Sequence, residues 1–441
     1  MRQADRVGLV FWRFVLKIVV VGAGIIGVTT AYELVERGHQ VTLLDSRSGA
    51  GLETSYANGG QLSACQVAPW AGPDVPGLVL RWLGRADAPF RLQLKADPEQ
   101  WLWLLRFLTR CRASARAERV LPNLSLALLT QARMDAIAEK FDNDPIKYDE
   151  RRTGILQLFH RAASLKSATS GLARMSAAGL EQKVLDPREC VELEPALAMA
   201  HDSGAFVGGI FCQSDRMGDA YKYTSQLAAR SQSLGVNFVN DAEVTSFKTQ
   251  GDEITGVHTR VGTFEADAVV LAAGIGTTRL ARMAGARIPV YPLKGYSVTL
   301  PVNPDVVVPN VSVTDEAHKI VVSRLGERLR IAGTAEVCGY DENIEMRRAR
   351  SVIKAAAELL PQIKDDEDKA EYWSGLRPMS SDGSPIIGRA GRFKNLYLNT
   401  GHGSLGWTMA AGSASALTDL ICGSAPQIDL TPFNIKRFKF I

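Results

Sequence analysis

The first clear hydrophobic pattern in the chain is a short β-branched run, followed by glycines and then by an amphipathic segment. Residues 17–21 (Lys-Ile-Val-Val-Val) have the composition of a buried strand. Residues 28–38 have the pattern of a helix that ends at Gly38, and residues 40–45 that of a second buried strand. This part of the chain therefore predicts one strand–helix–strand unit.

The next part of the chain alternates between loops and helices. Residues 49–77 are rich in Gly, Ser, Asn and Pro and predict a loop. Residues 98–142 predict two helices, because Trp101, Leu104, Leu105 and Leu108 recur at helical spacing and a second helix is expected over 122–141. Residues 187–209 predict another loop.

The second half of the chain contains more strands. Asp219 is expected to cap a helix that runs to Gly235. Residues 250–252 predict a hairpin turn, and residues 267–274 a third buried strand that ends in glycine. Residues 288–335 alternate strands and turns, as in an antiparallel sheet.

The last 100 residues return to alternating helix and strand. A helix is expected at about 345–360, a strand at 395–399, and a final helix that runs to about residue 421. Since helices and strands interleave, the pattern predicts an α/β protein with a Rossmann-like parallel sheet and an inserted domain built on a mixed or antiparallel sheet plus helices. We assign residues 17–86, 200–275 and 376–432 to the first domain, residues 87–199 and 276–375 to the second, and residues 1–16 to a leader outside the fold.

Composition and charge narrow the class of protein. The chain has 441 residues, 46% hydrophobic and 22% charged, which are globular values, and its net charge of +4 does not indicate a nucleic-acid binder. Its six cysteines form no CxxC pair and its six histidines form no HExxH motif, so the sequence predicts no metal site and reduced, intracellular thiols. No apolar run reaches the length of a membrane span.

Three glycines after the first strand carry the first chemical signal. Gly22, Gly24 and Gly27 form a GxGxxG motif between a predicted strand and a predicted helix. Such glycines allow a tight turn, a close approach of the backbone to a pyrophosphate, and close packing of helix on strand. Asp45, at the end of the second strand, is placed to accept hydrogen bonds from ribose hydroxyls. The motif serves FAD and NAD alike, but the buried strand that ends at Gly274 and the late Asn-Thr-Gly-His-Gly segment favour a flavin.

Several longer segments carry a resemblance to a known family. VVVGAGIIGVTTAYEL, LETSYANGGQLS, APWAGPDVP, TGILQLF, PVYPLKGYSVTLP, WSGLRPMSSDGSPIIG and LNTGHGSLGWTMAAGS cover nearly the whole chain from Lys17 onward. With these segments the chain resembles the D-amino-acid oxidase-type FAD-dependent oxidoreductases and, within them, the family of bacterial D-amino-acid dehydrogenase small (catalytic) subunits. The family begins close to Lys17, which leaves residues 1–16 outside the match.

The resemblance implies a set of cofactor-binding residues for FAD. They are Val19, Val20, Val21, Gly22, Ala23, Gly24, Ile25, Ile26, Gly27, Asp45, Ser55, Asn58, Gly59, Gly60, Gly274, Gly401, His402, Gly403, Leu405 and Gly406. The last helix is expected to aim its N-terminus at the flavin N1–C2=O edge, with His402 as an additional donor or as a structural turn residue. Relatives with covalent flavin use a cysteine or histidine, and the GLRPMSSDG stretch has neither, so noncovalent FAD is expected.

Three residues are implied as catalytic. Arg377 resembles the family's carboxylate-binding arginine, although pairing with Asp382 or a backbone carbonyl is the alternative, and Pro378 suggests that this arginine ends a strand. Tyr296 is expected to contact substrate through its hydroxyl, and Lys294 to hydrogen-bond near flavin N5 through water. A core tyrosine and a solvated lysine are the alternatives.

The resemblance implies oxidation of a D-alanine-like D-amino acid to a 2-oxo acid and ammonia, by hydride transfer to flavin N5. The electron acceptor is expected to be a quinone or another non-oxygen carrier. A glycine- or sarcosine-type oxidase, a D-hydroxyproline-type dehydrogenase and a non-enzymatic flavoprotein are the alternatives. A partner subunit is also implied.

One basic, aromatic segment bears on the location of the protein. Residues 77–120 hold nine basic and four acidic residues together with Trp82, Trp101, Trp103 and Phe107, and the tail 433–441 is also basic and aromatic. Such a segment can lie on anionic lipid. The hypothesis is a cytoplasmic protein that associates peripherally with the inner membrane; an ordinary amphipathic helix packed on the second domain is the alternative.

Overall fold

The computed structural model describes residues 15–82, 88–304 and 306–438. Residues 1–14 of the expected leader lie outside the described residues. Its last two residues lead directly into the first strand, where the carbonyl of Leu16 accepts a hydrogen bond from the backbone N–H of Gln40. Among the described residues, no helix combines the length and apolarity that crossing a bilayer requires.

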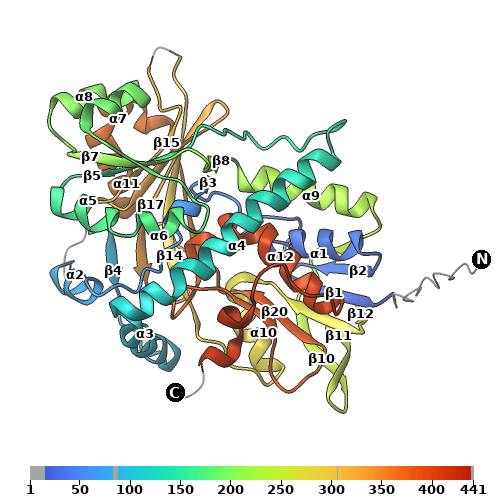
Figure 1. The fold of residues 1–441 in the computed structure, drawn as a ribbon. Helices are drawn as coiled ribbons and strands as arrows, with labels where there is room; N and C mark the ends of the chain where they lie inside the picture. Colours follow the sequence, from blue (N-terminus) through green and yellow to red (C-terminus); the bar gives the residue numbers. More distant parts are fainter. Residues whose placement is uncertain (1–14, 83–87, 305, 439–441) are drawn as a thin grey trace, which may run out of the picture.

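The N-terminal strand lies near the middle of a six-stranded sheet with the order β19-β20-β13-β1-β2-β9 (Figure 1). All neighbours are parallel except β19, which pairs antiparallel with β20. Its strands are β1 (Lys17–Val21), β2 (Gln40–Leu44), β9 (Asn237–Val239), β13 (Ala268–Leu271), β19 (Ile386–Arg389) and β20 (Leu396–Thr400). The predicted Rossmann-like parallel sheet is confirmed.

Both faces of this sheet are covered, which explains why β1 is apolar throughout. Ile18 and Val20 pack toward a helical layer, whereas Val19 and Val21 pack toward the opposite layer. The helical layer contains α1 (Ile25–Glu36), α4 (Ala113–Lys140), α9 (Ala220–Ser233) and α12 (Gly406–Ile421). The opposite layer contains β10 (Val244–Gln250), β11 (Glu253–Thr259), β12 (Thr263–Glu265) and α10 (Thr277–Met283).

The second large sheet has nine strands, most of them antiparallel. They are β4 (Phe90–Leu92), β5 (Ile155–Phe159), β6 (Lys183–Leu185), β7 (Gly208–Cys212), β14 (Val290–Pro301), β15 (Ser312–Asp315), β16 (Ile320–Leu325), β17 (Arg328–Val337) and β18 (Glu371–Ser380). Helix α11 (Met346–Leu359) packs its apolar residues on one face. A two-stranded ladder, β3 (Gln61–Leu62) with β8 (Arg216–Met217), lies apart from both large sheets.

Several predicted elements are confirmed, and two are wrong. Helix α4 begins at Ala113 rather than at 122, and it continues through Pro122. The expected loop at 187–209 contains α7 (Pro187–Leu193), α8 (Ala198–Asp202) and the start of β7. A capping box between Asp186 and Glu189 begins α7 and was the missed signal.

The remaining helices are short or flank the second sheet. They are α2 (Val75–Trp82), which begins at the end of the expected loop 49–77, α3 (Pro98–Arg110), α5 (Ala162–Thr169) and α6 (Leu172–Ser176). The expected domain boundaries differ from the sheets at several elements, including α10 (Thr277–Met283) and the end of β18. Helix α4 packs on the six-stranded sheet's helical layer although it falls in 87–199, and β7 belongs to the nine-stranded sheet although it falls in 200–275.

Candidate active site

A cavity of about 1360 Å³ is lined by residues from both large sheets. The glycine-rich turn after β1, the loop 53–60 and the start of α12 line it from the side of the six-stranded sheet. Strands β14, β17 and β18 line it from the other side. A cavity of this size, with two sheets as walls, is large enough for a dinucleotide together with a small substrate.

The three glycines of the GxGxxG motif have different structural roles. Gly22 has a φ of +105°, and a β-carbon there would lie 2.5 Å from the Cα of Ala273. A β-carbon on Gly27 would lie 1.7 Å from the carbonyl oxygen of Gly22, so this glycine lets α1 pack on the turn. Gly24 has ordinary extended angles, and only the Ser55 hydroxyl, at 3.6 Å, would be near its β-carbon. The side of Gly24 that faces the cavity is therefore open for a ligand.

Asp45 is held at the cavity by two backbone hydrogen bonds. Its carboxylate accepts from the N–H of Ala23 at 2.5 Å and from the N–H of Arg47 at 2.8 Å. Burial raises the pKa of Asp45, and these two bonds oppose the rise. Ser55 in turn accepts from the N–H of Ile25 at 3.1 Å, which ties loop 53–60 to the start of α1.

Most of the predicted cofactor-binding residues line this cavity. They are Val21, Gly22, Gly24, Ile25, Ile26, Asp45, Ser55, Asn58, Gly59, Gly60, Gly274, His402, Gly403, Leu405 and Gly406. The others lie behind the lining: Val19 and Val20 are in the core of the six-stranded sheet, and Ala23, Gly27 and Gly401 support the turns. The structure thus brings together segments that are up to 380 residues apart.

Arg377 lies in the cavity wall with its guanidinium above Gly295 of the neighbouring strand. Its Nη1 donates to the carbonyl of Thr334 at 3.0 Å, and the ring of Trp70 lies 5.9 Å from its Cζ. No carboxylate of the described residues forms an ion pair with it. Burial lowers the pKa of Arg377 to about 10, so the group remains a cation at neutral pH. A buried cation with open donors is suited to binding an anionic group.

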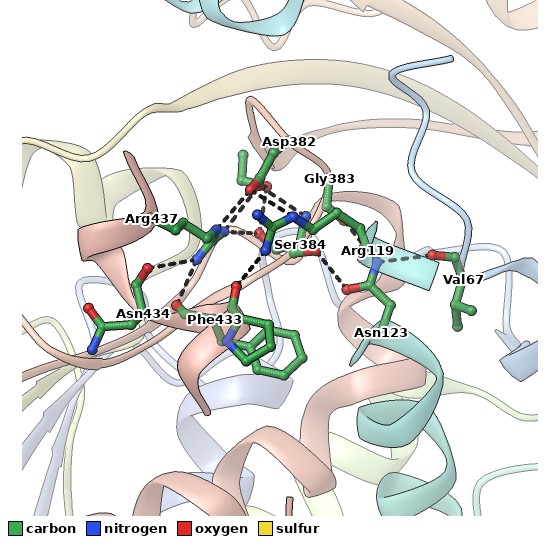
Figure 2. Close-up of polar contacts among 11 residues, drawn as sticks. Val67, Arg119, Asn123, Asp382, Gly383, Ser384, Phe433, Asn434 and Arg437 are labelled. Carbon is green, nitrogen blue, oxygen red and sulfur yellow. Dashed lines mark hydrogen bonds and ion pairs between the residues drawn. The ribbon is translucent and has the colours of Figure 1, made fainter. Parts of the chain in front are cut away.

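The alternative partner, Asp382, is occupied elsewhere. Its carboxylate accepts from Nε and Nη2 of Arg437 at 2.8 and 3.1 Å, and Arg119 lies 3.6 Å away (Figure 2). This cluster fixes the C-terminal segment, because Phe433 is also fully buried. The described part of the basic tail is therefore docked on the protein through Arg437, whereas Lys436 is exposed. The pairing of Arg377 with Asp382 is excluded.

Arg377 is also not at a strand end. It lies inside β18, and Pro378 pairs directly with Pro292 of β14. Proline has no backbone N–H, so two paired prolines fit a position of an antiparallel ladder at which the paired residues exchange no hydrogen bonds. Proline is also tolerated here because β18 lies at the edge of the sheet. The expectation that Pro378 ends the strand is wrong for this reason.

Lys294 and Tyr296 face the opposite side of the sheet. Because side chains alternate along β14, Gly295 faces Arg377 and its two neighbours point away. The Lys294 ammonium donates to Asp341 and to the carbonyl of Asn343, each at 3.0 Å. Although Tyr296 adds to the cavity lining, its hydroxyl donates to the buried Glu336 at 3.0 Å. Both polar groups are thus hydrogen-bonded within the protein, and the expected contacts with flavin and substrate stay predictions.

The His402 imidazole is neutral, and it is held in place by a hydrogen bond within the protein. Burial lowers its pKa to about 3, and its Nε2 lies 2.9 Å from the hydroxyl of Ser413. That hydroxyl donates its proton to the carbonyl of Met409, so it accepts from the Nε2–H of His402. Nδ1 therefore has no proton, and the His402 side chain is not the additional donor that was considered; the turn-residue alternative fits.

Several buried polar atoms of the cavity wall have no hydrogen-bond partner within the described protein. They are the Ser297 and Thr334 hydroxyls, Asn399 Oδ1, Trp407 Nε1 and Gln182 Nε2. Unsatisfied buried polar atoms are costly, so this wall fits a ligand that is itself polar. Trp70, Thr334 and Trp373 had not been singled out from the sequence; the two tryptophans lie within the segments that carried the family resemblance.

Comparisons with known proteins agree with this geometry. Residues 17–420 match the family model DAO, described as FAD dependent oxidoreductase. A D-amino acid dehydrogenase of Paramagnetospirillum magneticum is 44% identical over 96% of this chain and 99% of its own length. One of Rhizobium rhizogenes is 40% identical over 96% and 100%. The solved glycine oxidase of Geobacillus kaustophilus (TM-score 0.77, 23% identity, 97% and 100% coverage) and the L-proline dehydrogenase of P. horikoshii (0.73, 20%, 96% and 98%) share the fold.

The chain belongs to the DAO family of FAD dependent oxidoreductases. It is an FAD-dependent enzyme, and its residues fit that cofactor. The open side of Gly24, the φ of Gly22 and the carboxylate of Asp45 suit the pyrophosphate and ribose of a dinucleotide. The N-terminus of α12 and the unpartnered polar atoms of the wall suit the polar edge of an isoalloxazine ring.

Proposed function

We propose that the protein is a D-amino-acid dehydrogenase, which oxidises D-alanine-like amino acids to 2-oxo acids and ammonia. The single observation that carries this proposal is the Arg377 guanidinium: a buried cation on the cavity wall with no anionic partner among the described residues. The names of the relatives that are 38–44% identical supply the D-configuration.

Arg377 binds the substrate carboxylate. A guanidinium offers two parallel N–H donors that match the two carboxylate oxygens. Its hydrogen bond to the carbonyl of Thr334 fixes the plane of the guanidinium, and the absence of a side chain at Gly295 leaves room for it. The carboxylate anchor, together with the walls around it, then orients the substrate Cα–H toward the ring.

FAD supplies the hydride-accepting N5 atom when it is bound. The substrate amine reacts in its neutral form, because its lone pair stabilises the developing imine. Helix α12 begins at Gly406, directly after the short turn Gly403–Leu405, and both line the cavity. The partial positive charge of the N-terminus of α12 therefore lies at the cavity wall. We expect this charge to stabilise the negative charge that reduction brings to the ring. The sequence of steps needs no side-chain base.

An anaerobic titration tests this function. D-Alanine is expected to bleach the oxidised flavin spectrum and L-alanine to leave it unchanged. In Arg377→Lys, flavin is retained, but the rate of bleaching per unit of D-alanine falls roughly 100-fold, since a point charge replaces a bidentate fork. A holoprotein that D-alanine and other D-amino acids do not bleach would contradict the proposal.

The acceptor is proposed to be a quinone. Part of the cavity wall comes from α2, α4 and α6. Beside Arg116 and Arg174 it includes five apolar residues: Leu78, Val79, Trp82, Val120 and Met175. An apolar arm of this kind suits a lipophilic acceptor better than a charged one. After anaerobic reduction, a short-chain quinone is expected to restore the yellow colour much faster than air does. Rapid recolouring by air with peroxide release would instead favour an oxidase of the glycine or sarcosine type. D-proline derivatives test the D-hydroxyproline alternative.

Helix α3 is proposed to contact the cytoplasmic face of the inner membrane. Trp101, Leu105 and Leu108 lie on one face of this helix and are 50–53% exposed, whereas Trp103 on the other side is buried. Arg110 and Arg112 follow on its C-terminal side. An exposed apolar stripe next to basic residues is typical of helices on anionic lipid.

Vesicle sedimentation tests the membrane contact. The protein is expected to sediment with vesicles that contain phosphatidylglycerol, and Leu105→Glu together with Leu108→Glu is expected to abolish sedimentation. A protein that stays in the supernatant at low salt refutes the membrane contact. The implied partner subunit is a further candidate for the same stripe, and a stable second polypeptide in the purified complex would indicate it.

A further inference from the structure

Two histidines and an aspartate meet at one edge of the nine-stranded sheet, outside the lining of the large cavity. His160 directly follows β5, and Asp315 is the last residue of β15. These two strands are parallel, with Leu158 paired to Asp315, so their carboxyl ends lie at the same edge. His318 lies in the turn between β15 and β16. Spacing along the chain gave no sign of this group, because 155 residues separate His160 from Asp315.

The ligand atoms of the three side chains lie within 4.8 Å of one another. His160 Nε2 is 3.0 Å from Asp315 Oδ1, and His318 Nδ1 is 2.8 Å from Asp315 Oδ2. The Asp315 side chain is fully buried, and those of His160 and His318 are 20% and 28% exposed. The group is thus anchored in the protein but reachable from solvent.

The orientation of His160 differs from that of a simple ion-pair partner. Despite the 3.0 Å distance, its Nε2 makes no hydrogen bond within the described protein, so the nitrogen is not directed at the Asp315 oxygen. Asp315 Oδ1 accepts instead from the backbone N–H groups of Ala317 and His318, at 2.8 and 3.1 Å. The buried His160 Nε2 is thus directed into the cluster without a hydrogen-bond partner among the described residues.

A fourth side chain lies next to His318. Glu358, near the end of α11, has Oε2 at 3.3 Å from His318 Nε2, and its side chain is 60% exposed. The Nδ1–H of His318 donates to Asp315 Oδ2 at 2.8 Å, because a carboxylate oxygen accepts. A metal ion bound at Nδ1 would take the place of this proton.

We propose that His160, Asp315 and His318 form a binding site for one divalent transition-metal ion of the Zn²⁺ type. Two imidazole nitrogens and one carboxylate favour Zn²⁺, Co²⁺ or Ni²⁺ over Mg²⁺ or Ca²⁺, which prefer oxygen ligands alone. Three protein ligands leave at least one position for water or a small ligand.

The site would link the ends of β5 and β15 to the turn 316–319. Glu316 and Lys319 of this turn line the large cavity and pair with each other at 2.7 Å. A bound ion would therefore hold one part of the cavity rim in place. This inference does not depend on the proposed substrate or on the electron acceptor.

A cobalt titration of the untagged, FAD-loaded protein tests the site. Co²⁺ is expected to produce saturable d–d absorption bands at one equivalent, in the red part of the spectrum where oxidised flavin does not absorb. Zn²⁺ is expected to remove these bands, and Mg²⁺ to leave them unchanged. His160→Gln and His318→Gln are each expected to weaken Co²⁺ binding at least tenfold.

His201→Gln is the matched control, because His201 pairs with Asp202 at 3.2 Å on the surface without a third ligand. It is expected to bind Co²⁺ like the wild type. If His160→Gln does not fold, His318→Gln in the surface turn decides the test. Absence of saturable bands, or equal binding by wild type and both site variants, would show that the three residues form an ion-pair cluster only, and would overturn the proposal.

Discussion

Arg377 lies over the backbone of Gly295: a β-carbon added to Gly295 would be 2.2 Å from the Nη2 atom of Arg377. The space above this glycine is thus the space that the guanidinium occupies. Because the atoms in the way belong to the flexible end of a side chain, a substitution at Gly295 displaces the guanidinium and leaves the backbone in place.

Gly295→Ala is therefore expected to fold, to retain FAD and to raise the KM for D-alanine roughly tenfold, by loss of one charge-assisted hydrogen bond of about 1.5 kcal/mol. Steady-state kinetics measures this change. If the effect acts through Arg377, the double variant Gly295→Ala/Arg377→Lys is no worse than Arg377→Lys alone. Additive effects would mean that Gly295 acts on something else.

The glycine motif allows a comparison of two substitutions that look alike in sequence. Gly24→Ala is expected to leave the protein stable but to weaken FAD binding at least tenfold, because the methyl group enters the space expected for the pyrophosphate. Gly27→Ala is expected to destabilise the fold itself by about 3 kcal/mol or more, because its β-carbon would lie 1.7 Å from the Gly22 oxygen. Thermal unfolding of the apoprotein and flavin fluorescence separate the two effects. Equal stability of both apoproteins would contradict these roles.

The buried His402 is expected to make the protein sensitive to acid. Its pKa is about 3 in the folded protein because burial disfavours the charged form, against about 6.5 for an unperturbed histidine. Between these values the unfolded chain binds a proton that the folded protein does not, so stability is lost as the pH falls from about 6.5 toward about 3. The loss from this group is at most about 1.4 kcal/mol per pH unit.

His402→Gln keeps a donor for Ser413 but does not titrate. We expect it to have a shallower decrease in urea midpoint between about pH 7 and about pH 4 than the wild type. His201→Gln, at a partly exposed histidine, is the control and is expected to match the wild type. Parallel pH profiles of wild type and His402→Gln would show that His402 does not account for the acid sensitivity.

The Asp382–Arg437 pair is expected to hold the C-terminal segment on the protein. Both side chains are nearly fully buried, and Arg437 holds the pKa of Asp382 below its usual value against the effect of burial. Arg437→Met leaves a buried carboxylate and is expected to destabilise the protein by about 3 kcal/mol. Chemical denaturation measures the loss, and Lys436→Met is the control, with an expected change within about 0.5 kcal/mol. Asp382→Asn combined with Arg437→Met is expected to recover part of the stability.

The sequence predicted those parts of the site that are formed by contiguous motifs, and it did not predict those that depend on the pairing of strands. The GxGxxG turn, Asp45 and loop 53–60 are contiguous motifs with fixed roles, and they line the cavity as expected. The register of β14 was not accessible from the sequence: the β-branched and polar pattern of this long strand does not tell which face meets the cavity. The sequence therefore did not show that Lys294 and Tyr296 lie on the face opposite Arg377, because a strand that is buried on both sides lacks the alternation that marks the two faces.

Contacts between segments that are far apart in the chain could not be predicted from the sequence either. Arg437 reaches Asp382 only because the tail folds back over the protein, and His160 meets Asp315 only because β5 and β15 are adjacent and parallel. Neither contact corresponds to a motif or to a periodic pattern in the sequence.

By itself the sequence determined the α/β class, the glycine turn and the family, because these rest on short-range stereochemistry: strand and helix periods, glycine angles and motif spacing. The tertiary structure decided which side chains share a cavity wall, that Arg377 lacks a carboxylate partner, and that two histidines converge on one aspartate. The reason is physical, since strand register and the order of strands in a sheet are fixed by packing between segments far apart in the chain, and that packing is a property of the whole fold.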